Sequence, residues 1–295
     1  MASTGVTGPV RVWVKALRLK HWTKTFFVVA PFLIGPRFGL NGYLLRALAG
    51  AFVFGLFSSA VYLFNDIKDA PRDRVHPTKR DRPIASGRIS VRAAALVGVG
   101  LLVVSLGLGW WMDTRFVLIL IAYGANNVAY SLYLKNKTVV DILSIAIGFV
   151  LRVIAGGYLV DVPVTNWLLA SVFTLAVMMG FGKRRGEYEE LRDDARSVRA
   201  VHESYSIPKL DLLLGISASI TIVTYMLYSM APETIQIHGT DKLILTTPFV
   251  VYCIYRYTLK VQELRGGDPV ELILKDRGFT LAGLSWLGLL LYLTK

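Results

Sequence analysis

Residues 43–73 read YLLRALAGAFVFGLFSSAVYLF-NDIKDAPRD, and they set the architecture of the chain. The part from 43 to 64 is long and apolar enough to cross a bilayer, which takes about 20 mostly apolar residues. Asp66, Asp69 and Asp73 follow directly where the apolar run stops. If the helix continues through them, spacings of three and four residues place all three carboxylates on one face. The stretch therefore predicts a membrane helix that leads into a row of carboxylates.

A dense cluster of cations follows this row, in the run RVHPTKRDRPIASG over residues 74–87. Spaced carboxylates suit Mg²⁺, which completes its shell with water and substrate phosphate. Neighbouring Lys and Arg side chains can neutralise the remaining phosphate oxygens. We therefore predict a diphosphate site at the membrane surface. The structural alternative is an acidic patch, paired with Lys68, Arg72 and Arg74 on a solvated helix end.

Long apolar runs recur along the whole chain, which has 295 residues and is 54% hydrophobic. We expect an all-α, polytopic membrane protein with about nine transmembrane helices. The nine segments are 24–36, 43–64, 92–112, 115–134, 139–160, 166–182, 211–231, 242–260 and 278–294. The first run lacks a convincing cleavage site, so we expect no cleavable signal peptide. Cys253 is the single cysteine, which excludes an internal disulfide and a cysteine metal cluster.

Positive charge is distributed unevenly between the two sides of this predicted topology. With a cytoplasmic N-terminus, most of the 33 Lys and Arg residues fall on inner segments, as the positive-inside rule requires. Anionic lipid headgroups and a phosphorylated substrate explain the net charge of +13, so we expect no nucleic-acid partner. We predict a multi-pass protein of the cell (inner) membrane whose N-terminus and active site are cytoplasmic.

The predicted organisation is a single membrane domain over residues 1–295, with a basic cytoplasmic arm at 1–23. Two long inner loops, 65–91 and 183–210, are too polar to enter lipid. Long loops in a compact fold tend to be functional. We therefore expect these two loops to close over a shared cavity and to hold the chemistry.

Two clusters within the middle helices have both functional and structural interpretations. Tyr130, Lys135 and Lys137 lie at an inner helix end, where they suit either a polar cavity or an ordinary interfacial belt. Arg152 lies in a segment that otherwise reads as membrane-buried, where an ionisable group is costly and usually faces a cavity or a partner. For Arg152 we favour a cavity or substrate-phosphate role over a salt bridge to an acid on another helix.

The start of the second loop and the N-terminal arm hold further candidates. Lys183, Arg184 and Glu187 fit one helical face, which suits either phosphate binding or a mixed-charge helix with internal pairs. Lys24 is either an interfacial anchor or a residue that reaches the site. No histidine forms a zinc-like spacing with another ligand.

The motif Asn65-Asp66-x-x-Asp69-x-x-x-Asp73 resembles the first aspartate-rich motif of the UbiA superfamily of intramembrane prenyltransferases. The length, the predicted helices and the two loops fit that superfamily over nearly the whole chain, as a UbiA-type bundle. More narrowly, the chain is similar to the decaprenyl-phosphate phosphoribosyltransferase branch. The residues that carry this similarity are His76-Pro77, Lys79-Arg80, Arg82 to Gly87, Tyr130-Ser131, Gly148-Phe149-x-x-Arg152-x-x-Ala155-Gly156, Lys183-Arg184 and Glu187.

The resemblance implies transfer of 5-phosphoribosyl from phosphoribosyl diphosphate to a polyprenyl phosphate, for cell-wall arabinan precursors. The cofactor it implies is Mg²⁺, held by Asn65, Asp66, Asp69 and Asp73, with the three aspartates catalytic. The substrate-binding residues it implies are Lys24, His76, Lys79, Arg80, Tyr130, Lys135, Lys137, Arg152, Lys183, Arg184 and Glu187. A phosphate acceptor is already anionic at neutral pH, so positioning and electrostatics would carry catalysis. A homo-oligomer is compatible with this interpretation.

The chain departs from the superfamily at its second motif. Aromatic prenyltransferases have a second Asp-x-x-x-Asp pair there, where this chain has Lys183-Arg184-Arg185-Gly186-Glu187. Cations in that place suit a donor with a further phosphate. Two alternatives stay open: an aromatic or haem prenyltransferase of the same superfamily, which the cationic loop disfavours, and a lipid or sugar-phosphate transporter, which the short, cation-poor outer connections disfavour.

Overall fold

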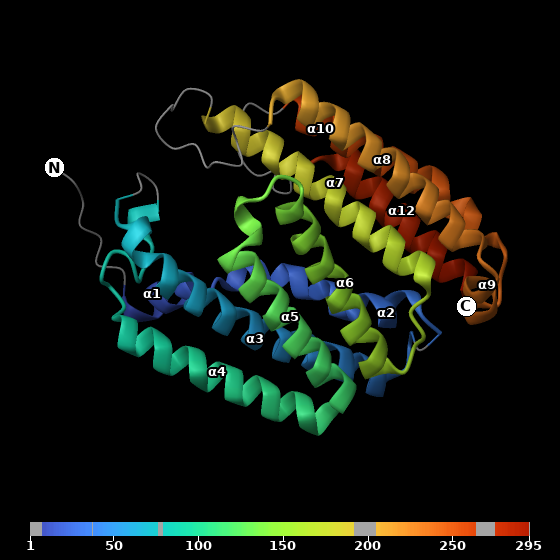
Figure 1. The fold of residues 1–295 in the computed structure, drawn as a ribbon. Helices are drawn as coiled ribbons and strands as arrows, with labels where there is room; N and C mark the ends of the chain where they lie inside the picture. Colours follow the sequence, from blue (N-terminus) through green and yellow to red (C-terminus); the bar gives the residue numbers. More distant parts are fainter. Residues whose placement is uncertain (1–7, 37, 76–78, 192–204, 264–274, 295) are drawn as a thin grey trace.

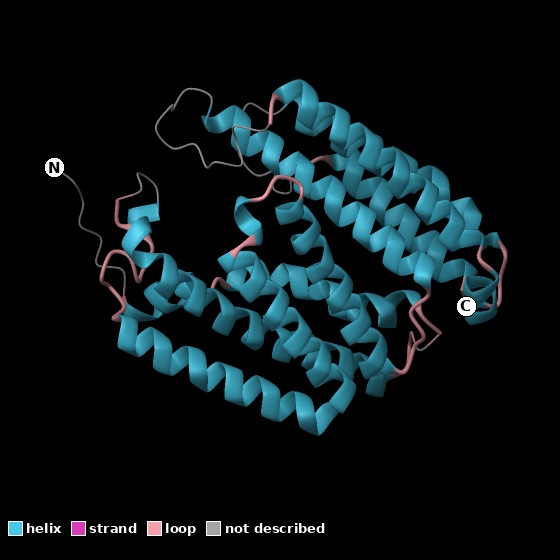
Figure 2. Cartoon of the chain, in the orientation of Figure 1, coloured by secondary structure: helices cyan, strands magenta, loops and turns pink. Residues whose placement is uncertain are grey.

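The computed structural model describes residues 8–36, 38–75, 79–191, 205–263 and 275–294, and within them it is helical without a strand (Figure 2). This confirms the all-α class. The basic arm contains α1 (Pro9–Ala16) and the 3₁₀ helix η1 (Leu19–Thr25), which leads into the short α2 (Phe26–Ile34). The described part of the arm is helical, and its Ala16 packs against Leu63 and Ala70.

Six helices of the described chain are long and apolar enough to cross a membrane. They are α3 (Asn41–Asp73), α4 (Val91–Met112), α5 (Thr114–Leu132), α6 (Val140–Val160), α7 (Asn166–Leu191) and α8 (Ile207–Met230). Together with their composition, these lengths make the chain an integral membrane protein.

The remaining helices are shorter, so the expected number of nine spans is not confirmed. They are α2, α9 (Pro232–His238), α10 (Thr247–Glu263) and α12 (Arg277–Leu293), with the 3₁₀ helices η2 (Lys79–Asp81), η3 (Leu134–Asn136) and η5 (Lys242–Thr246). The apolar segment 24–36 begins as a 3₁₀ turn, so α2 keeps only 9 residues. At 1.5 Å per residue α2 is about 14 Å long, roughly half the hydrocarbon thickness.

Both long inner loops are shorter than predicted, because helices continue into them. The backbone hydrogen bonds of α3 run on to Asp73, and the amide of Arg74 donates to the carbonyl of Ala70 at 3.1 Å. On the other side α7 extends to Leu191 and α8 begins at Ile207. The first motif therefore lies on a helix, and residues 192–204 of the second loop are outside the described part.

Two groups of helices lie side by side, α2–α6 and α7–α12, and α6 packs on α7 between them (Figure 1). Each group has its own apolar core, one around Phe54, Phe116 and Leu120 and the other around Leu210 and Leu214. Because lipid tails are also apolar, close packing holds such helices together more than exclusion from water does.

A glycine permits one of these close helix contacts. A Cβ atom at Gly156 of α6 would overlap the backbone carbonyl of Val28 on α2. Only a residue without a side chain lets the two backbones approach this closely. The contact holds α2, which follows the N-terminal arm in the chain, against α6.

Candidate active site

The three motif aspartates lie on one face of α3, in its last two turns, as their spacing predicts. Asp66 and Asp73 are each 5% exposed, and Asp69 is partly exposed. Asn65, also expected to bind metal, is half-buried beside them. Two buried carboxylates need positive partners, because an unpaired charge at such depth is costly. The structure supplies them from two other segments.

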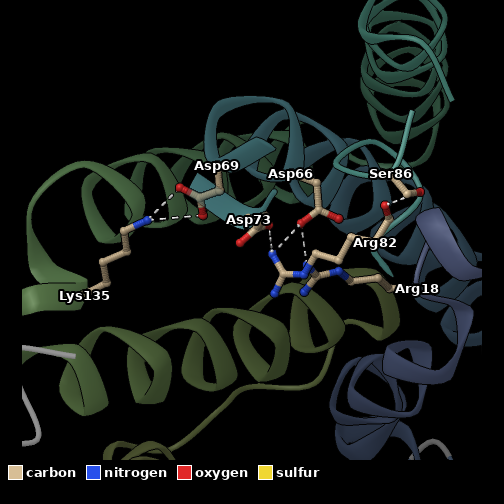
Figure 3. Close-up of polar contacts among 7 residues, drawn as sticks. All are labelled: Arg18, Asp66, Asp69, Asp73, Arg82, Ser86 and Lys135. Carbon is tan, nitrogen blue, oxygen red and sulfur yellow. Dashed lines mark hydrogen bonds and ion pairs between the residues drawn. The ribbon is translucent and has the colours of Figure 1, made fainter. Parts of the chain in front are cut away.

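Asp66 pairs with two arginines, and Asp73 shares one of them (Figure 3). Nη2 of Arg18, in the arm, donates to Oδ1 of Asp66 at 2.6 Å. Nη1 of Arg82 donates to the same oxygen at 3.2 Å and to Oδ2 of Asp73 at 2.7 Å. A single guanidinium nitrogen thus bridges two carboxylates that stand two turns apart on α3.

A tight turn positions Arg82 for this bridge. The backbone amide of Ser86 donates to the carbonyl of Arg82 at 2.9 Å, and the Ser86 hydroxyl donates to the same carbonyl at 2.8 Å. Gly87 has φ +77°, the left-handed conformation that glycine adopts most readily. Ile84 and Ala85 are buried and anchor the turn against the bundle. The Pro-Ile-Ala-Ser-Gly run is therefore a support for Arg82.

Asp69 lies on the same face of α3 but has a different partner, Lys135 of η3 (Figure 3). Nζ of Lys135 donates to its two carboxylate oxygens at 3.0 and 3.2 Å. Lys68 of α3 donates to the carbonyl of Ser131 on α5 at 3.1 Å, which links these two helices next to the Asp69–Lys135 pair. The structure thus brings Lys135, one of the predicted substrate-binding residues, next to the first motif.

The ligand chemistry of this cluster suits Mg²⁺, since carboxylates and an amide offer only hard oxygen ligands. The bridging nitrogen of Arg82 shows that one positive centre can be shared by Asp66 and Asp73. No group of three or more His, Cys, Asp or Glu side chains in the described ranges is gathered closely enough to hold a metal ion. Ligation by all three aspartates therefore requires them to exchange their present cations for the metal.

The second motif forms a separate ion-pair cluster between α6 and α7. The guanidinium of Arg184 donates to Oδ2 of Asp141 from Nε at 2.9 Å and from Nη2 at 2.7 Å. It also pairs through Nη1 with Glu187. Asp141 is fully buried, whereas the Lys183 side chain is 54% exposed and lies 4.0 Å from Glu187. Arg184 therefore ties two helices together, and Lys183 is the more accessible cation.

Tyr205 supports the backbone next to this cluster. Its hydroxyl accepts a hydrogen bond from the amide of Val139 at 2.8 Å, immediately before α6. Val139 has φ +69°, which is unusual for a β-branched residue. Burial raises the pKa of Tyr205, so the hydroxyl stays neutral and available as an acceptor at neutral pH.

A Tyr205→Phe variant is expected to lower the free energy of unfolding by about 1–2 kcal/mol, because the amide of Val139 loses its acceptor. The midpoint of thermal unfolding in detergent measures this change. Tyr133→Phe is the matched control, since that side chain is 68% exposed. A Tyr205→Phe protein as stable as the Tyr133→Phe protein would show that the bond contributes nothing.

Arg152 lies apart from both clusters, twelve residues into α6 and so about 18 Å along the helix from its start. Its Nη1 donates to the carbonyl of Gly148 at 2.7 Å and its Nη2 donates to the hydroxyl of Tyr123 at 2.9 Å. The guanidinium also stands over the rings of Phe54, Tyr123 and Phe149. These contacts include no acid, so the salt bridge considered above is absent from the described chain. They also do not bring Arg152 to the aspartates.

The other predicted residues are distributed over η1, η2, α5 and the segment after η3. Lys24 is half-buried on η1, Lys79 and Arg80 are on η2 three and two residues before Arg82, and Tyr130 is near the end of α5. Lys137 is exposed after η3. The remaining candidate, His76, lies outside the described residues.

Sequence reasoning missed three residues that pair with the predicted ones: Arg18, Arg82 and Asp141. Arg82 stands inside the basic run and could have been chosen from it. Asp141 lies in the first turn of α6, and its pairing with Arg184 spans 43 residues. Arg18 is 48 residues from Asp66, and no local spacing marks it.

Fold and site together define the class, a polytopic helical membrane protein with carboxylates and cations gathered at one end of the bundle. The UbiA prenyltransferase family model matches residues 25–274, and the chain belongs to this family.

Curated relatives narrow the comparison. The chain is 32% identical to the decaprenyl-phosphate phosphoribosyltransferase of Mycolicibacterium smegmatis, over 93% of this chain and 90% of the relative. The enzyme of the same name from Corynebacterium glutamicum is also 32% identical, over 92% of this chain and 83% of the relative. A solved UbiA homologue from Archaeoglobus fulgidus, bound to DMAPP and Mg²⁺, matches with a TM-score of 0.73 at 19% identity, over 96% of this chain and 98% of that one. That structure supports the fold.

Proposed function

We propose that this chain transfers the 5-phosphoribosyl group of phosphoribosyl diphosphate to a polyprenyl phosphate and releases diphosphate. The observation that carries the proposal is the similarity, over nine-tenths of both chains, to the decaprenyl-phosphate phosphoribosyltransferase of Mycolicibacterium smegmatis. The product class would serve as a lipid-linked precursor for cell-wall arabinan. The charge bias of the sequence supports an inner-membrane protein with this site at the cytoplasmic face.

The site suits a donor that is rich in phosphate. Asp66, Asp69 and Asp73 lie on one helix face, and the cations Arg18, Arg82 and Lys135 stand directly against them. Carboxylates hold a divalent ion, whereas guanidinium and ammonium groups bind phosphate oxygens. The residue types that a metal–diphosphate site would need therefore lie within hydrogen-bonding distance of each other.

Several residues would prepare the donor for reaction. Mg²⁺, when bound to the aspartates, would supply charge stabilisation to the departing diphosphate. Arg82 and Lys135 would hold the diphosphate oxygens, and Lys183 stands exposed on α7 for a further phosphate. The bond from the anomeric carbon to the diphosphate oxygen breaks, and an oxygen of the lipid phosphate forms the new bond to that carbon. The lipid phosphate is already anionic, so the protein need not remove a proton.

Arg184 has a different role in this proposal from the one that the resemblance implies. Because Asp141 and Glu187 already neutralise it, it would position the end of α7 and leave phosphate binding to Lys183. This arrangement leaves Lys183 as the exposed cation, and no carboxylate pair at Asp-x-x-x-Asp spacing, along residues 183–187. It favours a sugar donor with an additional phosphate over an allylic diphosphate.

The purified full-length protein is expected to form a labelled lipid from phosphoribosyl diphosphate carrying radiolabel in its ribose, a polyprenyl phosphate and Mg²⁺. Thin-layer chromatography of the organic phase measures this product. One parallel reaction replaces the donor with an allylic diphosphate and the lipid acceptor with an aromatic compound. Another adds the labelled donor to the outside of sealed proteoliposomes and measures its uptake. A folded protein that makes no labelled lipid would contradict the proposal. Product only from the allylic donor would indicate an aromatic prenyltransferase, and uptake without turnover would indicate a transporter.

A further inference from the structure

Arg18 has an unusual backbone conformation for a residue with a long side chain. Its φ of 53° and ψ of 43° are left-handed, and it stands at the start of η1. A non-glycine residue in this conformation is strained, because its Cβ atom crowds the following carbonyl oxygen. Such strain persists where surrounding contacts enforce it, and it is frequent at functional sites. Here the conformation directs the side chain from the arm to the end of α3.

Two contacts hold the Arg18 guanidinium at that position. Nη2 lies 2.6 Å from Oδ1 of Asp66, and Cζ lies 4.9 Å from the centre of the Tyr62 ring. Tyr62 is one turn before Asp66 on α3, and His21 contacts its ring edge-to-face at 5.6 Å. The guanidinium is thus fixed between a carboxylate and an aromatic face, with 24% of its side chain exposed.

If Oδ1 of Asp66 bound Arg18 and a divalent ion at the same time, the two positive charges would repel each other. Mg²⁺ binds oxygen at about 2.0–2.1 Å, so an ion on Oδ1 of Asp66 would stand within about 5 Å of Nη2. Positive charges this close repel each other unless an anion lies between them. Arg82 bonds the same oxygen, which adds a second cation to the conflict. Metal binding at Asp66 must therefore displace the arginines or bring in an anion for them.

We propose that Arg18 is a releasable counter-cation, which holds Asp66 until donor and metal arrive together and then binds the donor diphosphate. The donor half of this exchange rests on the proposed function. Each partner lowers the cost of binding the other, so metal and donor bind with positive coupling. Arg18 is then a donor-binding residue that opposes metal binding alone and favours the metal–donor complex.

The test is Mn²⁺ binding to the full-length protein in detergent, measured by electron paramagnetic resonance with and without phosphoribosyl diphosphate. An Arg18→Gln variant is expected to bind Mn²⁺ alone about tenfold more tightly than the wild type, or about 1.4 kcal/mol. The same variant should lose about tenfold in donor affinity measured with saturating Mn²⁺. Lys20→Gln, which removes an exposed cation from the same arm, should change neither value.

The opposite signs separate this role from a purely structural one, because a damaged site would bind both ligands more weakly. Unchanged or weaker Mn²⁺ binding by Arg18→Gln would overturn the proposal. If that variant does not fold, Arg82→Gln decides, since it removes the cation of Asp73 and one of the two cations on Asp66 and should also tighten Mn²⁺ binding. If Arg18→Gln binds Mn²⁺ more tightly but the wild type does not bind phosphoribosyl diphosphate, the result would support the release of Asp66 and would contradict only the proposed function.

Discussion

An Asp73→Asn variant is expected to lose at least about 10²-fold in metal-dependent turnover. Asp73 is 5% exposed and its Oδ2 lies 2.7 Å from Nη1 of Arg82, so its charge is a central part of the site. Asparagine keeps the shape of the side chain but cannot supply the negative charge that holds a divalent ion. Loss of one preorganised electrostatic contribution to the transition state typically costs about 10²–10³ in rate.

The measurement is the initial rate of labelled lipid formation as a function of Mg²⁺ concentration. Asp81→Asn is the matched control, because Asp81 is exposed on η2 and its backbone carbonyl receives the contact from Lys15. The control should keep nearly full activity. Near-normal turnover by Asp73→Asn, at an unchanged Mg²⁺ requirement, would remove Asp73 from the metal site.

An Asp141→Ala variant is expected to be the most destabilised of the substitutions considered for this chain, by about 3–5 kcal/mol. The Asp141 side chain is fully buried, with 0% exposed, and the Arg184 side chain is 8% exposed. Removing one partner of a buried pair leaves the other charge buried with less compensation, and that cost is about 3–5 kcal/mol. Glu187, at 33% exposed, compensates Arg184 only in part.

Thermal unfolding in detergent should show a decrease in Tm of about 10 °C for Asp141→Ala. The control is Arg115→Ala, which breaks a pair whose arginine side chain is 55% exposed and should change stability by less than about 1 kcal/mol. The double variant Asp141→Ala with Arg184→Ala should be more stable than the sum of the two single losses predicts. A Tm equal to that of the wild type would show that the pair does not hold α6 to α7.

Local spacing predicted the parts of the site that depend on one helix. Asp66, Asp69 and Asp73 fall on one face because three and four residues both approximate one helical turn. Lys135 was also expected at the site, since charge and helix length place it at the same membrane surface. The same reasoning was wrong about the loop boundaries, because polar residues that flank a membrane helix can extend it as well as end it.

Pairing between segments could not be predicted in the same way. Arg184 was assigned to phosphate, and the structure ties it to Asp141 on another helix. Arg152 was considered as a phosphate or salt-bridge residue, and the structure encloses it among three aromatic rings. A charge can choose among many partners at similar membrane depth, and only helix packing determines which partner is within reach.

The row of aspartates at the end of α3 follows from the order of residues along the chain, since helical periodicity needs no tertiary contact to align them. Only the tertiary structure determines which cations lie against these aspartates. Arg18 reaches Asp66 across 48 residues through a left-handed turn, and Arg82 reaches two aspartates from a tight turn supported by Ser86. Periodicity is a local property, whereas charge pairing depends on how separate segments pack in space.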